Sequence, residues 1–248
     1  AQAQRTLGDL AGALRSYRRA DSIVAARSAQ LYPLHVLRLR RGYAQLLEEL
    51  GEQPEAAAQA AIGEALSRGD IGLSVERAAT LVVQAQILLR SDPAAALGAG
   101  TEAMQLYQSG LSPTHPLAIR ALNGLCAQEL SGDVPGAPSC DEAANRLAAA
   151  RYADPMLRQA VAENLAERAA RQRDSVQMES RALESLAAAA TLGTPDPVWR
   201  ASYLMARAQQ AQQQPEMAIF FGKQAVDHLQ LLRRPLFEVD ARLDAAFL

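Results

Sequence analysis

The stretch GDLAGALRSYRRA, residues 8–20, sets a pattern that the rest of the chain repeats. A Gly-Asp turn is followed by Ala13, Tyr17 and Ala20, whose spacings of four and three residues place them on one face of a helix. The same frame returns along the chain at intervals of 43, 40, 41, 41 and 40 residues. Its first positions are Ala13, Ala56, Ala96, Ala137, Met178 and Ala218. The sequence therefore predicts a repeat protein with a period of about 41 residues.

A second helix is expected before each turn. These helices are predicted at about 33–50, 75–90, 116–130, 155–172 and 197–212. Four of the five begin at a proline, which suits the first turn of a helix. Each repeat then consists of helix A, a tight turn, helix B and a longer loop. Such hairpins bury their apolar faces only by stacking on their neighbours, so we expect a solenoid.

We expect the solenoid to fill the chain as one domain, 1–248. Its repeats are predicted at approximately 1–30, 33–70, 75–110, 115–151, 155–192 and 197–233, with a further C-terminal helix at 235–248. Residues 1–7 fit the end of a truncated helix A.

The composition is typical of an all-α fold, and the net charge and hydropathy limit the classes of partner to be expected. The chain is 49% hydrophobic but only 4% aromatic, and alanine, which costs least in a helix, is abundant. With 25 basic and 27 acidic residues the net charge is −2, so nucleic acid is not an expected partner. The apolar runs are too short for direct membrane insertion. The start AQAQRTLGDL has neither an initiator Met nor a signal segment, which suggests a processed or trimmed start and leaves the compartment open.

Cys126 and Cys140 are the two cysteines, and two alternatives stand for them. Both could be small buried thiols. They could also form a disulfide, because helix A should end near Leu130 and the sequence SCDE, 139–142, is typical of a capping box that opens the next helix at Ser139. A disulfide would favour a periplasmic or secreted protein over a cytoplasmic one.

No catalytic or metal-binding constellation is apparent. A cysteine nucleophile needs a nearby base, and His115 falls at the opposite end of the hairpin. His35, His115 and His228 belong to different repeats without ligand spacing. No cofactor motif occurs either, so we expect a protein that is not an enzyme and carries no cofactor or metal.

The turn Gly8-Asp9 followed by Ala13, Tyr17 and Ala20 resembles the tetratricopeptide repeat (TPR). The long period and the segment SPTHPLAIRALNGL, 112–125, resemble the kinesin-light-chain type of TPR. This resemblance covers nearly the whole chain. It implies a right-handed α-α superhelix whose A helices line a concave groove.

A narrower resemblance lies at the C-terminal end. The stretch AIFFGKQAVDHLQLLRR, 218–234, is similar to the last repeat of bacterial proteins in which a TPR array precedes a caspase-like CHAT protease domain. Within it, FFGKQAV, 220–226, carries the match. The resemblance implies that the chain recruits or regulates such a protease.

The register of the TPR family implies which residues face the groove. An apolar centre would be formed by Leu81, Ala85, Leu88, Ile119 and Leu122. The polar flanks would be Arg41, Gln45, Glu48, Glu163, Glu167, Arg200, Tyr203 and Arg207.

Such a groove suits a peptide or protein segment, which makes protein–protein interaction the expected function. Ordinary solvated polar positions are the simpler interpretation of the same residues. A bacterial peptide-sensing regulator, a structural scaffold and a homo-oligomer remain alternatives, and the oligomeric state stays open. Leu81 and Ala85 stand where a carboxylate clamp needs polar residues, which disfavours a chaperone tail as the ligand.

Overall fold

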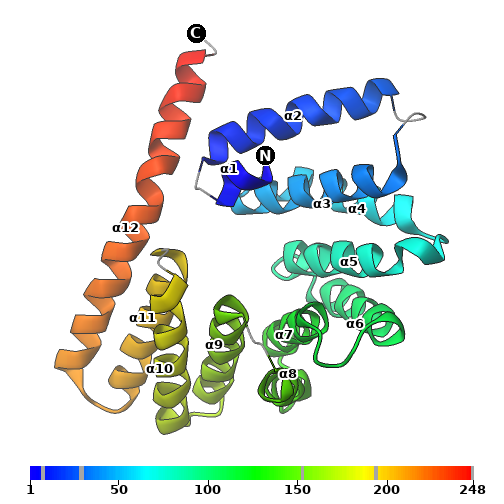
Figure 1. Ribbon diagram of the computed structural model, residues 1–248. Helices are drawn as coiled ribbons and strands as arrows, with labels where there is room; N and C mark the ends of the chain where they lie inside the picture. Colours follow the sequence, from blue (N-terminus) through cyan, green and yellow to red (C-terminus); the bar gives the residue numbers. More distant parts are fainter. Residues whose placement is uncertain (7–8, 28–30, 152–153, 193–194, 247–248) are drawn as a thin grey trace. The chain divides into compact units, whose positions relative to one another are not determined.

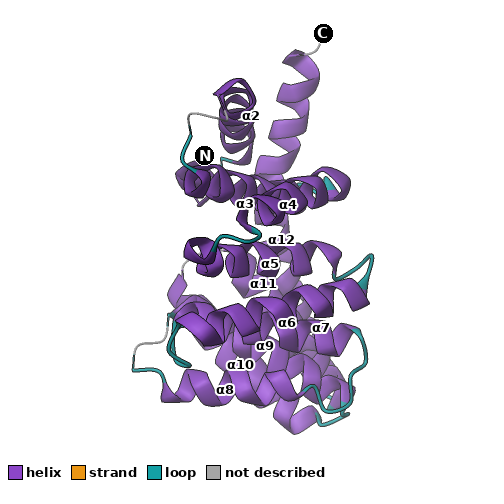
Figure 2. Ribbon diagram, turned by 90° about the vertical axis from the view of Figure 1, so that its right-hand side faces the viewer, coloured by secondary structure: helices purple, strands orange, loops and turns teal. Residues whose placement is uncertain are grey.

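The computed structural model describes residues 1–6, 9–27, 31–151, 154–192 and 195–246, and all of its regular structure is helical (Figures 1 and 2). Within these ranges there is no strand, and a short 3-10 helix, η2 (Ile71–Leu73), precedes α5. The A helices are α1 (Gln2–Thr6), α3 (Pro33–Glu49), α5 (Ser74–Leu88), α7 (Pro116–Ser131), α9 (Pro155–Arg171) and α11 (Pro195–Ala211). The B helices are α2 (Leu10–Arg27), α4 (Gln53–Ser67), α6 (Pro93–Gly110), α8 (Pro138–Ala149), α10 (Ser175–Leu192) and α12 (Pro215–Ala246).

The predicted all-α repeat architecture is confirmed. Helices α3, α5, α7, α9 and α11 begin at intervals of 41, 42, 39 and 40 residues, and their ends lie within two residues of the predicted ones. Five of the six first-frame residues are buried, and only Ala218 is half-buried. The repeated small residues therefore serve to pack the helices against one another.

The predicted end of the last repeat is wrong. A separate helix was expected at 235–248, but α12 continues from Pro215 to Ala246 without a break. A proline inside a helix removes one hydrogen bond and strains the turn before it, yet it does not always end the helix. Pro235 is such a case.

The tight turns after α3, α7, α9 and α11 share one hydrogen-bond pattern. After α9, Arg173 has φ 59° and the Asp174 N–H donates to the Ala169 carbonyl at 2.9 Å. Gly51 and Gln213 occupy the same left-handed place after α3 and α11. This is the Schellman ending of a helix, which satisfies carbonyls that the last turn leaves open.

An aspartate has the same role in three of the turns that lead into a B helix. The side chain of Asp9 accepts a hydrogen bond from the Gly12 N–H at 2.8 Å, and the side chain of Asp92 accepts one from the Ala95 N–H at 3.0 Å. Asp174 does the same for the Gln177 N–H. Each aspartate therefore caps the start of a B helix, which explains why this residue type recurs in the frame.

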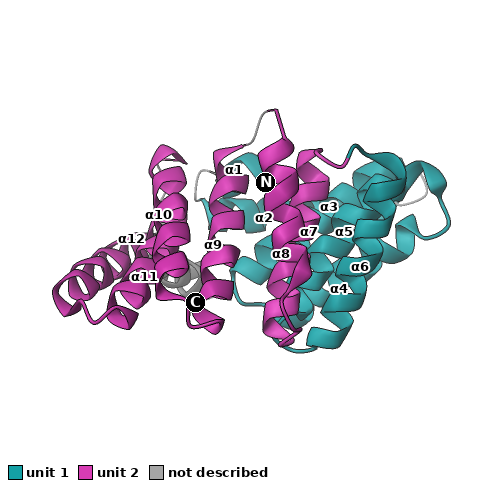
Figure 3. Ribbon diagram, turned by 90° about the horizontal axis from the view of Figure 1, so that it is seen from below, with its two compact units in different colours: residues 1–112 teal, residues 113–248 magenta. Residues whose placement is uncertain are grey.

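The chain divides into two compact units, Ala1–Ser112 and Pro113–Leu248, and each is described by itself (Figure 3). Within each unit a B helix packs against the A helix that follows it, as α4 does against α5 and α10 against α11. Successive A helices also contact one another, as α3 and α5 do in the first unit and α9 and α11 in the second. Each unit therefore consists of stacked helical hairpins.

Candidate functional site

Polar side chains connect successive A helices at the positions expected to line a groove. Arg41 on α3 donates to Glu76 on α5 at 2.6 Å, and Arg207 on α11 donates to Glu167 on α9 at 2.5 Å. In both units, therefore, predicted groove residues bind the neighbouring repeat. Their charges are largely satisfied by that pairing.

We call the polar contacts between successive A helices the ladder, and Gln45 takes part in it. Gln45 accepts a hydrogen bond from Arg5 of α1 at 2.9 Å, and Arg5 also pairs with Glu49 at 3.1 Å. These contacts favour a structural role for Gln45. Glu48 of the first unit and Glu163 of the second are partly buried.

The ladder shifts the acidity of its most buried carboxylate. Burial raises the pKa of Glu76, but hydrogen bonds from Arg38 and Arg41 outweigh that effect and hold the pKa below its ordinary value. Glu76 therefore stays ionised where an isolated buried carboxyl would tend to be neutral.

The expected apolar groove centre is wrong. Leu81 is 3% exposed, Ile119 1% and Leu122 5%, and Ala85 is also buried. Leu88 is half-buried. These residues lie on the sides of their helices that pack against other helices, because burying apolar side chains between helices is favourable. They offer little surface to a ligand.

Helix α11 presents the best-formed exposed surface among the predicted residues. Tyr203 is 51% exposed, and the Arg207 guanidinium lies 5.7 Å from the centre of its ring. One turn earlier, the Arg200 guanidinium lies 5.5 Å from the Trp199 ring. We call Trp199, Arg200, Tyr203 and Arg207 the α11 strip.

Trp199 was missed in the sequence-based prediction. It precedes Tyr203 and Arg207 at spacings of four, so helical periodicity would have placed it on the same face. The strip is anchored to the preceding A helix, α9, because Arg207 also bonds Glu167. An arginine held between a carboxylate and an aromatic ring keeps a fixed geometry.

The structure joins Cys126 of α7 and Cys140 of α8 as a disulfide, with their Cα atoms 4.7 Å apart. Both residues are almost fully buried, at 0% and 1% exposed. The bridge ties the two helices together across the loop between them. It therefore holds the hairpin that begins the second unit.

The predicted capping box at Ser139 is wrong. Helix α8 begins at Pro138, and Ala137 stands at its N-cap position with φ 40°. The Ser139 hydroxyl donates to Glu129 at 2.7 Å and its N–H donates to the same carboxylate at 2.9 Å. The buried carboxylate on α7 thus takes the N–H that a capping box would have paired with Glu142, and it holds the Ser139 hydroxyl as a donor, whereas a capping serine hydroxyl accepts.

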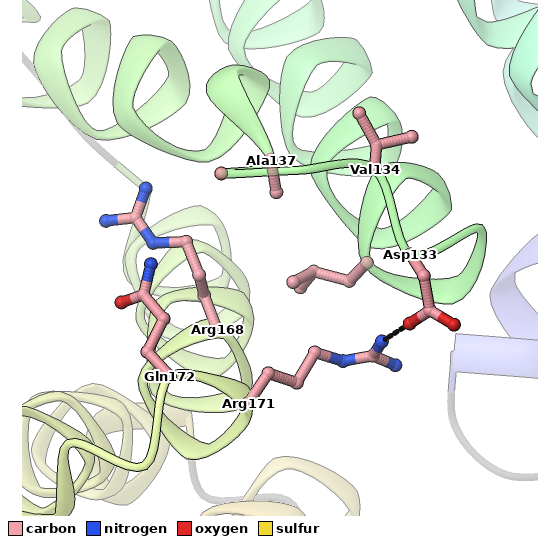
Figure 4. A pocket seen from close by; sticks show the side chains of 8 residues that line it. Asp133, Val134, Ala137, Arg168, Arg171 and Gln172 are labelled. Carbon is pink, nitrogen blue, oxygen red and sulfur yellow. Dashed lines mark hydrogen bonds and ion pairs between the residues drawn. The ribbon is translucent and has the colours of Figure 1, made fainter.

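A shallow pocket lies where this loop meets the end of α9 (Figure 4). Arg171 pairs with Asp133 at 2.5 Å, and Arg168 pairs with Asp141 at 2.7 Å. Figure 4 shows Arg168, Arg171 and Gln172 along one side and the loop residues Asp133, Val134 and Ala137 along the other. Both arginines already pair with carboxylates, so we interpret the pocket as a polar contact between the loop and α9 and not as a ligand site.

The described part of the chain contains no group of three His, Cys, Asp or Glu residues that could hold a metal ion. None of its helices is both long enough and apolar enough to cross a membrane. The three histidines make local contacts: His115 accepts a hydrogen bond from the Leu117 N–H at 3.2 Å, His35 lies edge-on to Tyr32, and His228 bonds the Gln224 carbonyl.

Comparison with known proteins supports the fold. The chain is similar to the crystal structure of BtubC (BKLC) from P. vanneervenii, with a TM-score of 0.65, 12% sequence identity and 91% of each chain covered. No family model matches the sequence, and neither does a curated protein. At 12% identity the likeness is one of fold alone. With the stacked hairpins described above, it shows that this chain is an all-α helical-repeat protein.

Proposed function

We propose that the chain is a non-catalytic protein-interaction module that binds a peptide or protein segment at the α11 strip. The observation that carries the proposal is Tyr203, a large aromatic residue that is 51% exposed beside the fixed guanidinium of Arg207. The few residues that dominate binding at protein interfaces are enriched in tyrosine, tryptophan and arginine. A rigid helix carrying all three types spends little entropy on binding.

The chemistry of the strip indicates the ligand. Guanidinium groups at 200 and 207 flank the ring of Tyr203 at spacings of three and four residues, on one side of α11. The exposed ring of Tyr203 favours an apolar or aromatic side chain, and Arg207 is held beside it by Glu167. We therefore propose a segment that carries an apolar or aromatic residue, and not nucleic acid.

Labelled peptides of that composition test the proposal by fluorescence anisotropy against the whole chain. Tyr203→Ala and Arg207→Glu should each weaken binding at least tenfold. The matched control is Tyr32→Ala, because Tyr32 is 64% exposed in the other unit and should not matter. Equal affinity for the wild type and Tyr203→Ala would refute the assignment.

A finer proposal concerns the C-terminal stretch that resembles the array before a CHAT protease. Packing alone does not explain the residue types of this stretch, because Phe220 is 59% exposed and Val226 is 52% exposed, whereas Ala225 is buried. On this proposal the chain is a TPR array that recruits or regulates such a protease. Sequencing the gene downstream of Leu248 tests it, because a protease domain with a His and a Cys should follow, and a reading frame that stops there excludes it.

A further inference from the structure

The second unit contains two pockets in equivalent places of successive repeats. The pocket of Figure 4 lies where the turn after α7 meets α9, and we call it the α7–α9 pocket. The other lies where the turn after α9 meets α11, and we call it the α9–α11 pocket. It is lined by Ala170, Arg173, Ser175, Met178, Arg207 and Ala211. The α7–α9 pocket has a volume of about 170 Å³ and the α9–α11 pocket one of about 310 Å³.

The repeat frame matches the two pockets residue by residue. Asp133 in the first and Arg173 in the second occupy the same left-handed place in their turns, with φ 52° and 59°. The two residues are 40 positions apart in the sequence. The same interval separates Arg171 of α9, which lines the α7–α9 pocket, from Ala211 of α11, which lines the α9–α11 pocket. The side chains at equivalent places can therefore be compared directly.

The ion pair that closes the α7–α9 pocket has no counterpart in the α9–α11 pocket. In the α7–α9 pocket, the carboxylate of Asp133 pairs with Arg171 at 2.5 Å. In the α9–α11 pocket, Arg173 stands in the place of the aspartate and Ala211 in the place of its arginine partner. The charge at the turn is thus reversed, and the small side chain of Ala211 leaves room in the larger pocket.

The guanidinium of Arg173 is left without a partner. No residue that the structure describes forms a hydrogen bond or ion pair with this exposed side chain. Three carboxylates of the same hairpin are already bonded: Glu167 to Arg207, Asp174 to the N–H of residue 177, and Glu179 to two glutamines of α11. A residue with a Cβ is also strained at φ 59°. The turn therefore carries an unpaired arginine at a place where glycine would be more stable.

We propose that the α9–α11 pocket binds a carboxylate of the protein segment that occupies the α11 strip. The incoming carboxylate pairs with Arg173 and supplies the negative charge that Asp133 supplies in the α7–α9 pocket. A guanidinium can hold a carboxylate through two parallel hydrogen bonds. This inference rests on the proposed function, to which it adds a chemical requirement on the ligand.

The pocket continues the face of α11 that carries the strip. Tyr203, Arg207 and Ala211 follow one another at spacings of four residues, and Arg207 belongs to both the strip and the pocket. Tyr203 and Ala211 are therefore about 12 Å apart along the helix. An extended segment spans that distance in about three to four residues. We expect the ligand to carry its carboxylate at that separation from its apolar or aromatic residue.

Labelled serine-rich decapeptides test the proposal by fluorescence anisotropy against the whole chain. Each carries one phenylalanine and, about three or four residues before or after it, one aspartate; matched peptides carry asparagine instead. The best aspartate peptide should bind about fivefold more tightly than its asparagine match. Arg173→Gln should remove that difference. Arg158→Gln is the control and should keep it, because Arg158 is an exposed arginine at the other end of α9.

Arg173→Gly keeps the test independent of folding, because it removes the same guanidinium and should melt at a higher temperature than the wild type. Equal binding of the aspartate and asparagine peptides, or a difference that survives Arg173→Gln, overturns the proposal even where Tyr203→Ala weakens both peptides. A difference that Arg173→Gln removes but Tyr203→Ala leaves intact refutes the α11 strip and supports the pocket.

Two further outcomes count against the pocket. Failure of every peptide to bind the wild type overturns the pocket and the strip together. A matched phosphoserine peptide that binds at least tenfold more tightly than the aspartate peptide overturns the choice of a carboxylate, because the pocket would then suit a phosphate group.

Discussion

Replacing Gly222 by alanine should stabilise the free protein. A glycine inside a helix costs about 0.5–1 kcal/mol relative to alanine, because it loses more backbone freedom on folding. The added Cβ meets nothing within 4 Å, so no packing penalty opposes that gain. We therefore expect the free energy of unfolding to rise by about 0.5–1 kcal/mol and Tm by roughly 1–4 °C.

Two matched variants set the scale of this experiment. Gly98→Ala on α6 also has open space at its Cβ and should give the same gain. Gly42→Ala should have the opposite sign, because its Cβ would lie 2.4 Å from the Tyr17 hydroxyl oxygen. Tyr17 is 4% exposed and stacks on Tyr43 with ring centres 5.5 Å apart, so it cannot move away cheaply. Overpacking of this kind costs about 1–3 kcal/mol, more than the helix gains.

The assay is urea unfolding followed by far-UV circular dichroism, with Tm from the same signal. A loss of stability in Gly222→Ala would refute the reasoning, because it would mean that some part of the free protein covers Gly222.

Other perturbations test the ion pairs of Glu64, the turn after α9 and the Cys126–Cys140 disulfide. Burial raises the pKa of Glu64, but hydrogen bonds from Arg68 and Arg77 outweigh that effect and lower the pKa. The ionised carboxylate therefore adds stability at pH values above its ordinary pKa of 4.5, and this stability is lost as the pH falls through the lowered value. In Glu64→Gln, the urea midpoint should change less with pH in that range. Arg173→Gly should raise the free energy of unfolding by about 1 kcal/mol, because φ 59° strains any residue with a Cβ, and a rise in Tm checks it. Cys140→Ser should lower the free energy of unfolding by about 2–4 kcal/mol in urea melts, and thiol titration of the wild type should find no free thiol even in denaturant.

The period and the helix positions could be predicted because they depend on local signals. Small residues at fixed spacing mark where a B helix meets the next A helix, and Ala60 and Ala182 are indeed fully buried there. Prolines begin A helices, and aspartates such as Asp92 cap B helices through their own side chains. Each of these signals acts within a few residues, so the sequence alone reveals it.

The features that were predicted wrongly depend on contacts between distant residues. Ser139 would cap α8 if it were alone, but the Glu129 carboxylate ten residues earlier accepts its hydroxyl and its N–H. Likewise Arg41 is a charged residue of the kind expected in a solvated groove, but it forms an ion pair with Glu76 on the next A helix. Local patterns cannot reveal partners that only the stacking of repeats brings near.

One register position shows why the exposed site could be found only in part. Leu122 and Tyr203 are equivalent in the repeat frame and belong to the same unit, yet they are 5% and 51% exposed. Residue type does not explain the difference, since each is large enough to be buried. Helix α9 contacts α7, which carries Leu122, whereas in the described residues no A helix follows α11. A repeat sequence thus predicts where contact surfaces lie, while the order of the repeats decides which of them a partner can reach.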